Sequence, residues 1–309
     1  MQVFSEGAYP PDAPHAAVTV GVYDGVHKGH RHVLSRLHEH AADRGLTTVV
    51  VTFDPHPAAV VAPERAPKLL TTLDRRLELL ADTGVDRCVV VGFDPLRSTQ
   101  SPASFVERVL VEELRADVVV VGENFRFGHN RQGDVALLAE IADRDGFAVE
   151  PVSLDDQDGE PISSTRIRAL LSLGDVASAA ELLGRPHELD GHVARGDGRG
   201  RELGFPTANL EVPEELCVPA VGIYAGIWTR QSGARHAAAV SIGRRPTFYE
   251  DAEVLIEAHL LDVDADLYGE SGRLEFAARL RGEERYDTLD ELVAQIGLDV
   301  DATRRLLSS

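Results

Sequence analysis

The chain has 309 residues, which is the length of about two average domains. It carries 51 acidic and 31 basic residues, for a formal net charge of −20. This acidity argues against a sequence-independent nucleic-acid binder or a binder of anionic membranes, because such proteins gain affinity by neutralising phosphates. We therefore expect no nucleic-acid and no membrane partner, while a small anionic ligand remains compatible because local groups and a metal can override the mean field.

Simple scans exclude several protein classes. No apolar run approaches the eighteen or so residues of a membrane span. The first 27 residues contain no Lys or Arg but do contain Glu6 and Asp12, so we expect no secretory signal peptide. Cys88 and Cys217 have neither metal-ligand nor redox spacing, which predicts inert thiols in a reducing cytoplasm. Neither lysine lies in a Walker A loop, so a P-loop kinase is excluded.

Strands and helices alternate in the first half of the chain. Apolar β-branched runs predict strands at 18–22, 47–53, 88–91, 118–121 and 147–152. Helical spacing links two sets of apolar residues, which are Val33, Leu34, Leu37 and Ala41, and then Leu73, Leu77 and Leu80. Ser101-Pro102 predicts the start of a helix that continues to Leu114, and two shorter helices are expected at 164–173 and 175–183. The pattern indicates a Rossmann-like α/β domain with a parallel sheet.

The segment from Gly21 to His30 joins the first long strand to the first helix. A helix N-terminus presents free N–H groups and the positive end of a dipole to a phosphate. His27 and His30 lie at this point and are able to donate to phosphate oxygens as charge develops. Taken alone, the H-x-G-H pattern is also compatible with a tight turn that exposes two histidines. However, this turn follows the carboxyl end of a predicted parallel strand, which is where open α/β sheets bind ligands, and its position therefore favours a ligand site.

Three later segments end strands or begin helices with polar or aromatic residues. Two prolines make 52–57 irregular, and 122–128 offers an amide, a guanidinium and two aromatic rings, which suit a planar ligand with a phosphate. Segment 163–168 places hydroxyls in the first turn of a helix with arginines just behind them, again a phosphate-binding arrangement. Each segment taken alone is also compatible with a rigid turn, an ordinary loop or a simple N-cap.

The sequence changes character after Gly184-Arg185-Pro186. The following segments are short, glycine-rich and alternating, at 222–229, 237–242 and 255–261, which predicts a small antiparallel β-barrel. A closing helix is predicted from a capping box at Thr288 and Glu291 and from a shared stripe of Leu289, Leu292, Val293, Ile296 and Val300. We place the domain boundary so that the domains are 1–186 and 187–309.

A second candidate site lies in the predicted barrel. Gly196, Gly200 and Gly204 suit a loop that wraps around phosphates, and Thr207 and Asn209 follow with oxygen atoms that are able to ligate Mg²⁺. A mobile hairpin would show the same glycines. Glu257 lies in an otherwise apolar strand, and a buried unpaired carboxylate is costly. Glu257 therefore has a partner or a chemical role, unless it faces outward from its strand.

These segments together resemble one family, the bacterial bifunctional riboflavin kinase/FAD synthetases, from about residue 17 to 307. The N-terminal matches read G-V-Y-D-G-V-H-K-G-H at 21–30, T-F-D-P-H-P at 52–57, N-F-R-F-G at 124–128 and S-S-T-x-x-R at 163–168. The C-terminal matches read G-R-x-L-G-F-P-T-A-N at 200–209, G-x-x-P-T-F at 243–248, E-x-H-L-L-D at 257–262 and D-L-Y-G at 266–269. The family ending L-R-x-E-x-K-F corresponds to 280–286 with Arg for Lys and Tyr for Phe, and Asn124 stands where many relatives carry Asp.

The resemblance implies two ATP-dependent reactions. Riboflavin and ATP would give FMN and ADP on the barrel, and FMN and ATP would give FAD and pyrophosphate on the α/β domain. Both steps would use a divalent cation, expected to be Mg²⁺, held at the barrel by Thr207 and Asn209. The expected catalytic residues are His27, His30 and, as the base for the riboflavin hydroxyl, Glu257. The family implies further ATP contacts by Gly21, Asp24, Ser164, Thr165, Arg168, Gly196 and Gly200, and flavin contacts by Asn124, Phe125, Arg126, Phe205 and Arg281.

Three alternatives stay open at this point. One module could be inactive, leaving a single activity. Both folds could bind flavin without turnover. The H-x-G-H pattern alone also permits an adenylyltransferase for another cofactor precursor, although the attached kinase motifs argue for flavin. We expect a cytoplasmic protein that is a monomer or a weak homo-oligomer.

Overall fold

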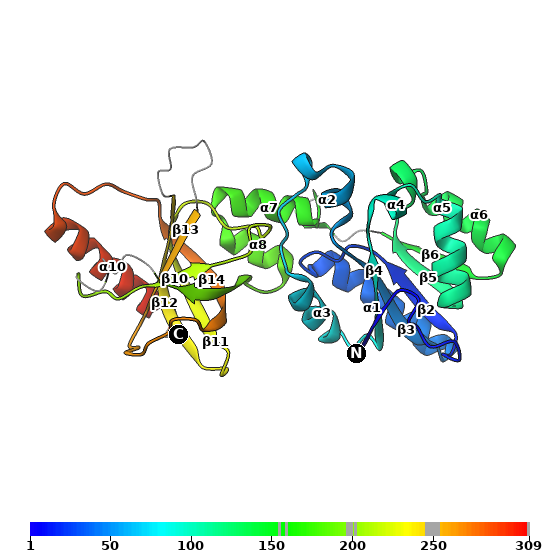
Figure 1. The fold of residues 1–309 in the computed structure, drawn as a ribbon, viewed down its shortest axis with the longest axis horizontal. Coiled ribbons are helices and arrows are strands. Elements are labelled where there is room, and N and C mark those ends of the chain that lie inside the picture. The colour runs from blue at the N-terminus through cyan, green and yellow to red at the C-terminus, as the bar shows by residue number, and fades with distance from the viewer. Residues whose placement is uncertain (154–155, 158–159, 196–199, 201–202, 245–253, 308–309) are drawn as a thin grey trace. The chain divides into compact units, whose positions relative to one another are not determined.

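The structure is a computed structural model that describes all residues except 154–155, 158–159, 196–199, 201–202, 245–253 and 308–309. Two compact units are present: Met1–Pro67 with Leu73–Ser163, and Lys68–Thr72 with Ser164–Ser309 (Figure 1). The packing therefore groups residues 164–186 with the second unit, whereas the sequence analysis put them in the first domain. The functional boundary at 186/187 stays a prediction.

The first unit is built on a parallel sheet, as predicted, and the sheet has one strand more than the five predicted. Its strands are β1 (Gln2–Ser5), β2 (Ala16–Val20), β3 (Thr47–Asp54), β4 (Arg87–Gly92), β5 (Ala116–Gly122) and β6 (Ala148–Val152). Their order is β1-β4-β3-β2-β5-β6, and every neighbouring pair is parallel. Strand β2 is central, and the chain moves to opposite sides of it to form β3 and later β5. The carboxyl end of β2 is therefore the point at which doubly wound sheets bind ligands.

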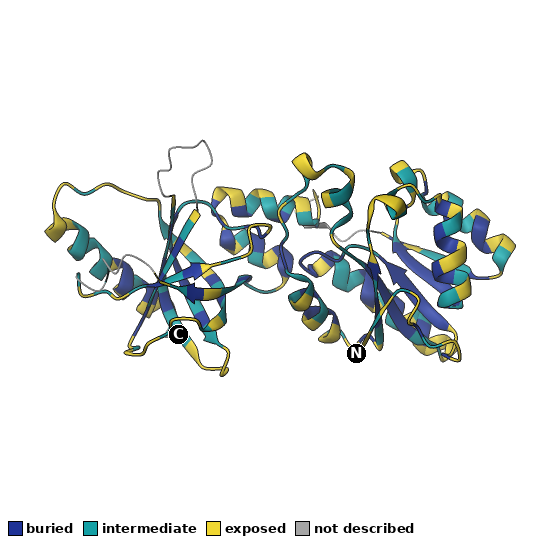
Figure 2. Cartoon of the chain, viewed as in Figure 1, coloured by how far each residue is buried: buried dark blue, intermediate teal, exposed yellow. Residues whose placement is uncertain are grey.

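Helices cover both faces of this sheet. Helices α1 (Lys28–Arg44) and α3 (Leu73–Ala81) share one core with Ala17 of β2, while the π-helical segment η2 (Val106–Glu113) and α6 (Val135–Asp145) pack with Val18 and Val20 on the other face. Side chains alternate along a strand, so β2 contributes to both cores. Figure 2 shows the central strands as buried along their length.

Shorter elements complete the first unit. They are α2 (Pro57–Val61), η1 (Pro63–Arg65), α4 (Pro95–Ser98), α5 (Pro102–Phe105), η3 (His129–Arg131), β7 (Asp156–Gln157) and β8 (Glu160–Pro161). The predicted helix start at Ser101 is confirmed, because the Ser101 hydroxyl oxygen accepts from the Ser104 N–H at 3.2 Å. The predicted helix continues through α5 and η2 and ends at Leu114.

The second unit contains a closed antiparallel barrel, also as predicted. Its strands are β9 (His187–Ala194), β10 (Ala208–Glu211), β11 (Gly222–Arg230), β12 (Arg235–Arg244), β13 (Val254–Leu260) and β14 (Ser271–Arg281), in the order β10-β13-β12-β11-β14-β9. Tyr224, Trp228 and Phe276 fill its interior. Two helices, α7 (Ser164–Leu173) and α8 (Val176–Leu183), pack on each other, and α8 contacts β9 and β14.

Five residues from early in the chain, Lys68–Thr72, belong to the second unit. Leu69 forms an isolated parallel bridge with Leu216. Its N–H donates to the carbonyl of Glu215 at 2.6 Å, and its carbonyl accepts from the N–H of Cys217 at 2.7 Å. We call this segment the strap, because backbone hydrogen bonds fasten it to the chain that leads into β11.

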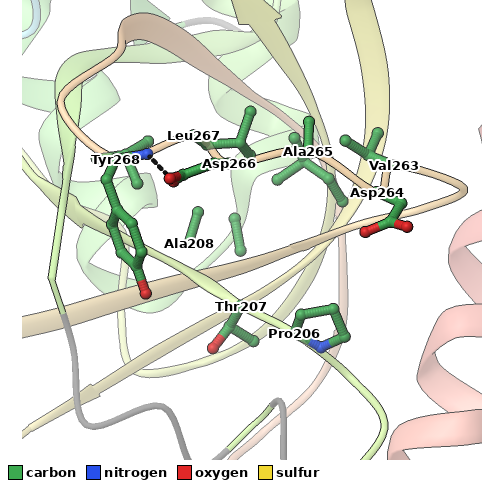
Figure 3. A pocket seen from close by; sticks show the side chains of 12 residues that line it. Pro206, Thr207, Ala208, Val263, Asp264, Ala265, Asp266, Leu267 and Tyr268 are labelled. Atoms are coloured by element: carbon green, nitrogen blue, oxygen red, sulfur yellow. Dashed lines mark hydrogen bonds between the residues drawn. The ribbon is translucent and has the colours of Figure 1, made fainter.

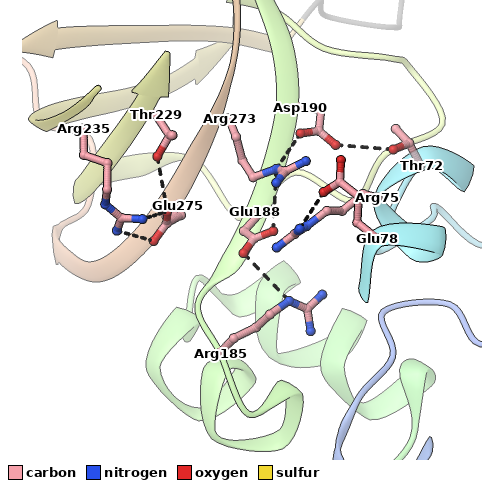
Figure 4. Close-up of polar contacts among 10 residues, drawn as sticks. All are labelled: Thr72, Arg75, Glu78, Arg185, Glu188, Asp190, Thr229, Arg235, Arg273 and Glu275. Carbon is pink, nitrogen blue, oxygen red and sulfur yellow. Dashed lines mark hydrogen bonds and ion pairs between the residues drawn. The ribbon is translucent and has the colours of Figure 1, made fainter. Parts of the chain in front are cut away.

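Charged side chains on β9 and β14 hold the end of the strap (Figure 4). The Thr72 hydroxyl donates to Asp190 at 3.3 Å, and Asp190 also accepts from Arg273 at 2.7 Å. Glu188 lies 3.8 Å from both Arg185 and Arg273. The side chain of Glu188 is only 9% exposed, so this network is worth more than an isolated surface pair.

The terminal helix α10 (Leu289–Leu307) begins with the predicted capping box. Glu291 donates its N–H to the Thr288 hydroxyl at 3.2 Å and accepts the Thr288 N–H at 3.3 Å. The predicted apolar stripe is partly confirmed: Val300 is buried, and the half-buried members are Leu292, Val293 and Ile296. Leu289, by contrast, is 66% exposed. The buried positions of the helix are Asp299, Val300 and Thr303, because only its later turns pack closely. Within the described residues, no helix has the length and apolar character of a bilayer span.

Candidate active sites

The loop after β2 turns sharply before α1 begins. Tyr23, Gly25 and Val26 all adopt positive φ values, of 55°, 83° and 39°. Such a conformation is strained for Tyr and Val, and it persists only where the surrounding structure enforces it. The Tyr23 hydroxyl hydrogen-bonds to that of Thr19 at 2.6 Å inside the core, and burial raises the pKa of Tyr23. The sequence motif therefore folds into a rigid turn at the carboxyl edge of the sheet.

His27 and His30 form a stacked pair at the N-terminus of α1. Their ring centroids are 3.6 Å apart, and His27 Nδ1 accepts from the His30 N–H at 3.3 Å as the N-cap. Gly29 leaves little room between them, because a Cβ there would lie 3.2 Å from the Ile162 carbonyl oxygen and 3.3 Å from the His27 ring. Burial, and then the nearby His27, lower the pKa of His30 well below its ordinary value. His30 is therefore neutral at neutral pH, and both rings lie where helix N–H groups attract an anion.

Two other predicted ATP residues lie in the same turn. Asp24 is 2% exposed, and Gly21 lies against the Tyr23 ring, which a Cβ would approach to 3.0 Å. The sequence analysis missed one residue here, the fully buried Arg76 of α3. Arg76 has helical spacing to Leu73 and Leu80, so it lies within the predicted apolar stripe. An arginine within an apolar stripe is unusual, and this feature of the sequence could have identified it.

The loop after β5 carries the predicted flavin residues. Asn124 and Arg126 are exposed, whereas Phe125 is half-buried and stacks on the buried Phe127 with a centroid distance of 5.2 Å. Arg126 forms an ion pair with Asp134 at 2.8 Å. The Leu137 N–H and Arg126 lower the pKa of Asp134. Since β5 is adjacent to β2, this loop and the histidine turn leave the sheet at the same edge.

Ser164 and Thr165 lie in the first turn of α7, as predicted, with Arg168 one turn later. The structure describes them within the second unit. Arg168 Nε donates to the carbonyl oxygen of Lys68, so the strap fixes this side chain. Ile162, two residues before the helix, is buried in the first unit with its carbonyl oxygen close to Gly29.

Glu257 faces outward from the barrel. Its neighbours in the strand, Ile256 and Ala258, are buried, while Glu257 is only partly so. The outward-facing reading is therefore the one that the structure bears out. Strand register places Asn209 of β10 and Ser241 of β12 directly opposite Glu257 on either side. Opposed residues on one face lie about 5 Å apart at Cβ. A carboxylate and an amide that the sequence separates by 48 positions are thus neighbours.

A cavity of about 460 Å³ opens where segment 263–268 faces β10 and β13, and its lining includes Ala208 and Ala258, the strand neighbours of Asn209 and Glu257 (Figure 3). Pro206, Thr207 and Ala208 line one side. Segment 263–268 lines the other and includes Tyr268, whose N–H donates to Asp266 at 3.1 Å. The sequence analysis quoted 266–269 only as part of a family match, and Asp264 and Tyr268 are additional candidate site residues. Only the fold shows that these two residues line the same cavity as Thr207.

Close packing shapes the loop before β10. A Cβ on Gly200 would lie 2.5 Å from the Phe205 carbonyl oxygen and 3.0 Å from the Thr207 hydroxyl, so only glycine fits. His259 Nδ1 donates to the Pro206 carbonyl at 2.8 Å, and the ring of Phe205 meets His259 edge-on at 5.5 Å. These contacts fix the backbone that carries Thr207. Gly196 and segment 245–248 lie outside the described residues.

Arg281, a predicted flavin residue, is bound by α10. Its Nε donates to Asp299 Oδ1 at 3.0 Å and its Nη2 to Oδ2 at 2.7 Å. This bidentate contact raises the pKa of Arg281. The guanidinium also lies 5.9 Å from the centroid of the Tyr286 ring. Arg281 therefore joins β14 to the terminal helix, and its flavin contact stays a prediction.

The barrel site fits a hard divalent cation. Thr207 provides a hydroxyl and Asn209 an amide oxygen. The carboxylates of Asp264 and Asp266 border the cavity that Thr207 lines. These are the oxygen ligands that Mg²⁺ takes, in sites it commonly shares with substrate phosphates. Among the described residues, no cluster of three or more His, Cys, Asp or Glu side chains is arranged to hold a metal ion.

Comparisons with known proteins agree with this arrangement of two sites. Residues 10–166 match the family model described as FAD synthetase, and residues 183–307 match the one described as riboflavin kinase. The bifunctional riboflavin kinase/FMN adenylyltransferase of Escherichia coli K12 is 38% identical over 91% of this chain and 90% of its own. The enzyme of the same description from Bacillus subtilis is 33% identical over 95% of this chain and 93% of its own.

The whole fold also matches a solved structure. A protein from Streptococcus pneumoniae, described as a macrolide-efflux protein, superposes with a TM-score of 0.89 and 27% sequence identity. The match covers 98% of this chain and 99% of that one. The order of an α/β unit followed by a barrel is therefore shared over the full length.

Proposed function

This chain belongs to the bifunctional riboflavin kinase/FMN adenylyltransferases, and from that premise we propose which residues perform each step. The chain carries both enzyme domains in order, so it makes FMN and ADP from riboflavin and ATP, and then FAD and pyrophosphate from FMN and ATP. The observation that carries the residue assignment is the pairing of Asn209 with Glu257 on the barrel and of His27 with His30 on the sheet edge.

In the kinase step, Glu257 accepts the proton of the riboflavin 5′-hydroxyl as that oxygen attacks the γ-phosphorus of ATP, and ADP leaves. A positioned general base of this kind contributes about 10²–10⁴-fold to a rate. Thr207 and Asn209 would hold a divalent cation, for which we propose Mg²⁺, and it would neutralise phosphate charge. Because Asn209 is the direct neighbour of Glu257, the phosphates and the base would be held close together. Gly200 admits the phosphates, and Phe205 and Arg281 would border the flavin.

In the adenylyl step, an oxygen of the FMN phosphate attacks the α-phosphorus of ATP, and pyrophosphate leaves. His27 and His30 would donate to ATP phosphate oxygens, with Gly21 and Asp24 shaping the turn. Ser164, Thr165 and Arg168 would also contact the triphosphate, and Asn124, Phe125 and Arg126 would contact the flavin. Positioning and charge stabilisation suffice for this transfer, so no covalent intermediate is required.

A time course tests the two activities directly. The full chain is incubated with riboflavin, ATP and MgCl₂, and riboflavin, FMN and FAD are separated by chromatography. FMN is expected first and FAD after a lag. FMN accumulating without FAD would identify an enzyme with one inactive module. Flavin binding without ATP consumption would favour a binding protein. Replacing MgCl₂ by other divalent salts tests the choice of metal.

The proposal also covers the location of the enzyme in the cell, its partners and its oligomeric state. We expect it to act in the cytoplasm on small molecules, without a nucleic-acid partner, as a monomer or a weak homo-oligomer. Sedimentation at several protein concentrations measures the oligomeric state. A stable assembly at nanomolar concentration would contradict this expectation.

A further inference from the structure

Arg76 of α3 is a buried cation that none of the proposed chemistry uses. Its side chain is 0% exposed, and Leu79 and Leu80 are buried on the same face of the helix. Removing a charged group from water is costly unless it is paired and hydrogen-bonded. The guanidinium at this position is therefore expected to make interactions that an apolar leucine side chain could not make.

One nitrogen of Arg76 joins the ends of two strands. Nη1 donates to the Val22 carbonyl at 3.1 Å, to the Thr52 hydroxyl at 3.1 Å and to the Phe53 carbonyl at 2.9 Å. The Thr52 hydroxyl in turn donates to Val22 at 2.9 Å. Val22 lies between β2 and the histidine turn, and Phe53 immediately precedes the 54–57 loop. The arginine thus fixes the backbones from which both loops emerge.

The other two nitrogens of the guanidinium, Nε and Nη2, are buried without a hydrogen bond to the described residues. Burial lowers the pKa of Arg76, while the nearby carboxylates of Asp24 and Asp54 act in the opposite direction. A guanidinium stays protonated in folded proteins at neutral pH, so the group keeps its charge. A fixed positive charge therefore lies behind the turn that would receive an ATP phosphate.

We propose that Arg76 is the positioning residue of the adenylyl-transfer site, which holds the loops after β2 and β3 in place and supplies a buried positive charge behind them. It acts through Val22, Thr52 and Phe53 rather than by touching substrate. This inference rests on the proposed assignment of His27 and His30 to that site. It accounts for a charged residue where the helix pattern alone calls for an apolar one.

The charge of Arg76 also bears on His30. Tyr23, His27 and Arg76 are the titratable groups that contact or influence its ring, and burial, His27 and Arg76 all lower the pKa of His30. A neutral His30 is then lost only at acidic pH, as the pH falls through that lowered pKa. Removing Arg76 takes away one of the three causes, so the acid limb of the reaction should move to higher pH.

The test compares Arg76→Gln, Arg76→Lys and the control Arg87→Gln in the full chain. Arg87 begins β4 at the opposite end of the sheet, where it donates to the Tyr9 hydroxyl at 3.0 Å. We expect Arg76→Gln to lower kcat/KM for FAD formation from FMN by about 100-fold, the scale for losing one preorganised group. FMN formation by the same preparation should be unchanged. Arg76→Lys should lose less rate and keep the acid limb of the wild-type protein.

The pH profile separates positioning from mere stabilisation. An acid limb that moves upward in Arg76→Gln, but not in Arg76→Lys or Arg87→Gln, supports the proposal, and so does a matching rise in the pKa of His30 by NMR. Equal losses at every pH, in proportion to lowered thermal stability, would make Arg76 structural only. If Arg76→Gln does not fold, the rate of Arg76→Lys decides: a lowered kcat/KM for FAD formation at unchanged thermal stability and unchanged FMN formation supports the proposal, and a wild-type kcat/KM overturns it. Unchanged FAD formation in His30→Ala would instead refute the site assignment itself.

Discussion

Glu257 illustrates how a single side chain is given its chemistry by its neighbours. It points outward beside Asn209 on a barrel whose inward positions are apolar. Glu257→Gln keeps the shape but removes the proton acceptor, so FMN formation should fall at least about 100-fold. FAD formation from added FMN should persist. Both rates are measured by chromatography, with Glu275→Gln, an outward carboxylate paired with Arg235, as the matched control. Loss of both activities together would contradict two independent sites.

Asn209 should affect how the nucleotide is held rather than how the proton moves. Asn209→Ala removes an amide oxygen, so the kinase step is expected to need more Mg²⁺ and more ATP, with about a tenfold rise in each requirement. Titrating MgCl₂ at fixed riboflavin gives the measurement. Glu211→Gln, on the same strand, is the control, because its carboxylate pairs with His192 instead. Unchanged metal dependence would refute the assignment of Asn209.

At the level of residues, the sequence shows which side chains are able to take part in the chemistry, but it rarely shows which residues they contact. The histidines of the H-x-G-H turn could be predicted as site residues because the strand before them and the helix after them are both visible in the adjacent sequence. Arg281 was different, since its partner Asp299 lies on another element and becomes visible only in the fold. Arg76 was missed because helical periodicity shows which positions face the core. It does not show that a charged side chain at one of those positions is buried there.

At the level of elements, length and burial decided what could be predicted. The five strands predicted in the first half all formed. Strands β2 to β5 are largely apolar runs with residues buried on both faces, whereas β6 lies at the sheet edge and is only partly buried. Strand β1 was missed: it is a short edge strand whose residues are mostly exposed. The strap was beyond prediction, because its backbone pairs with residues about 150 positions away and carries no periodic signal.

Helix α8 provides a test of where the kinase unit begins. Val176, Leu182 and Leu183 are buried, and α8 packs on β9 and β14. Each such side chain is worth about 1.5–3 kcal/mol when fully buried. A fragment of residues 164–309 should therefore unfold at a higher temperature than 187–309, and it should retain riboflavin kinase activity. Calorimetry of both fragments measures this. Equal stability would show that α7 and α8 contribute nothing to the barrel unit.

For the whole molecule, two active sites on one chain raise the question of how FMN passes from one to the other. The product of the kinase step is also a free substrate of the adenylyl step, so FMN that leaves one molecule should serve another. We predict that Glu257→Gln and His30→Ala, each unable to make FAD from riboflavin alone, together restore it. The mixture is followed with riboflavin and ATP, and FAD should appear after a lag that shortens as His30→Ala is added. An absence of FAD, with Glu257→Gln still active on added FMN, would mean that FMN is not released between the steps.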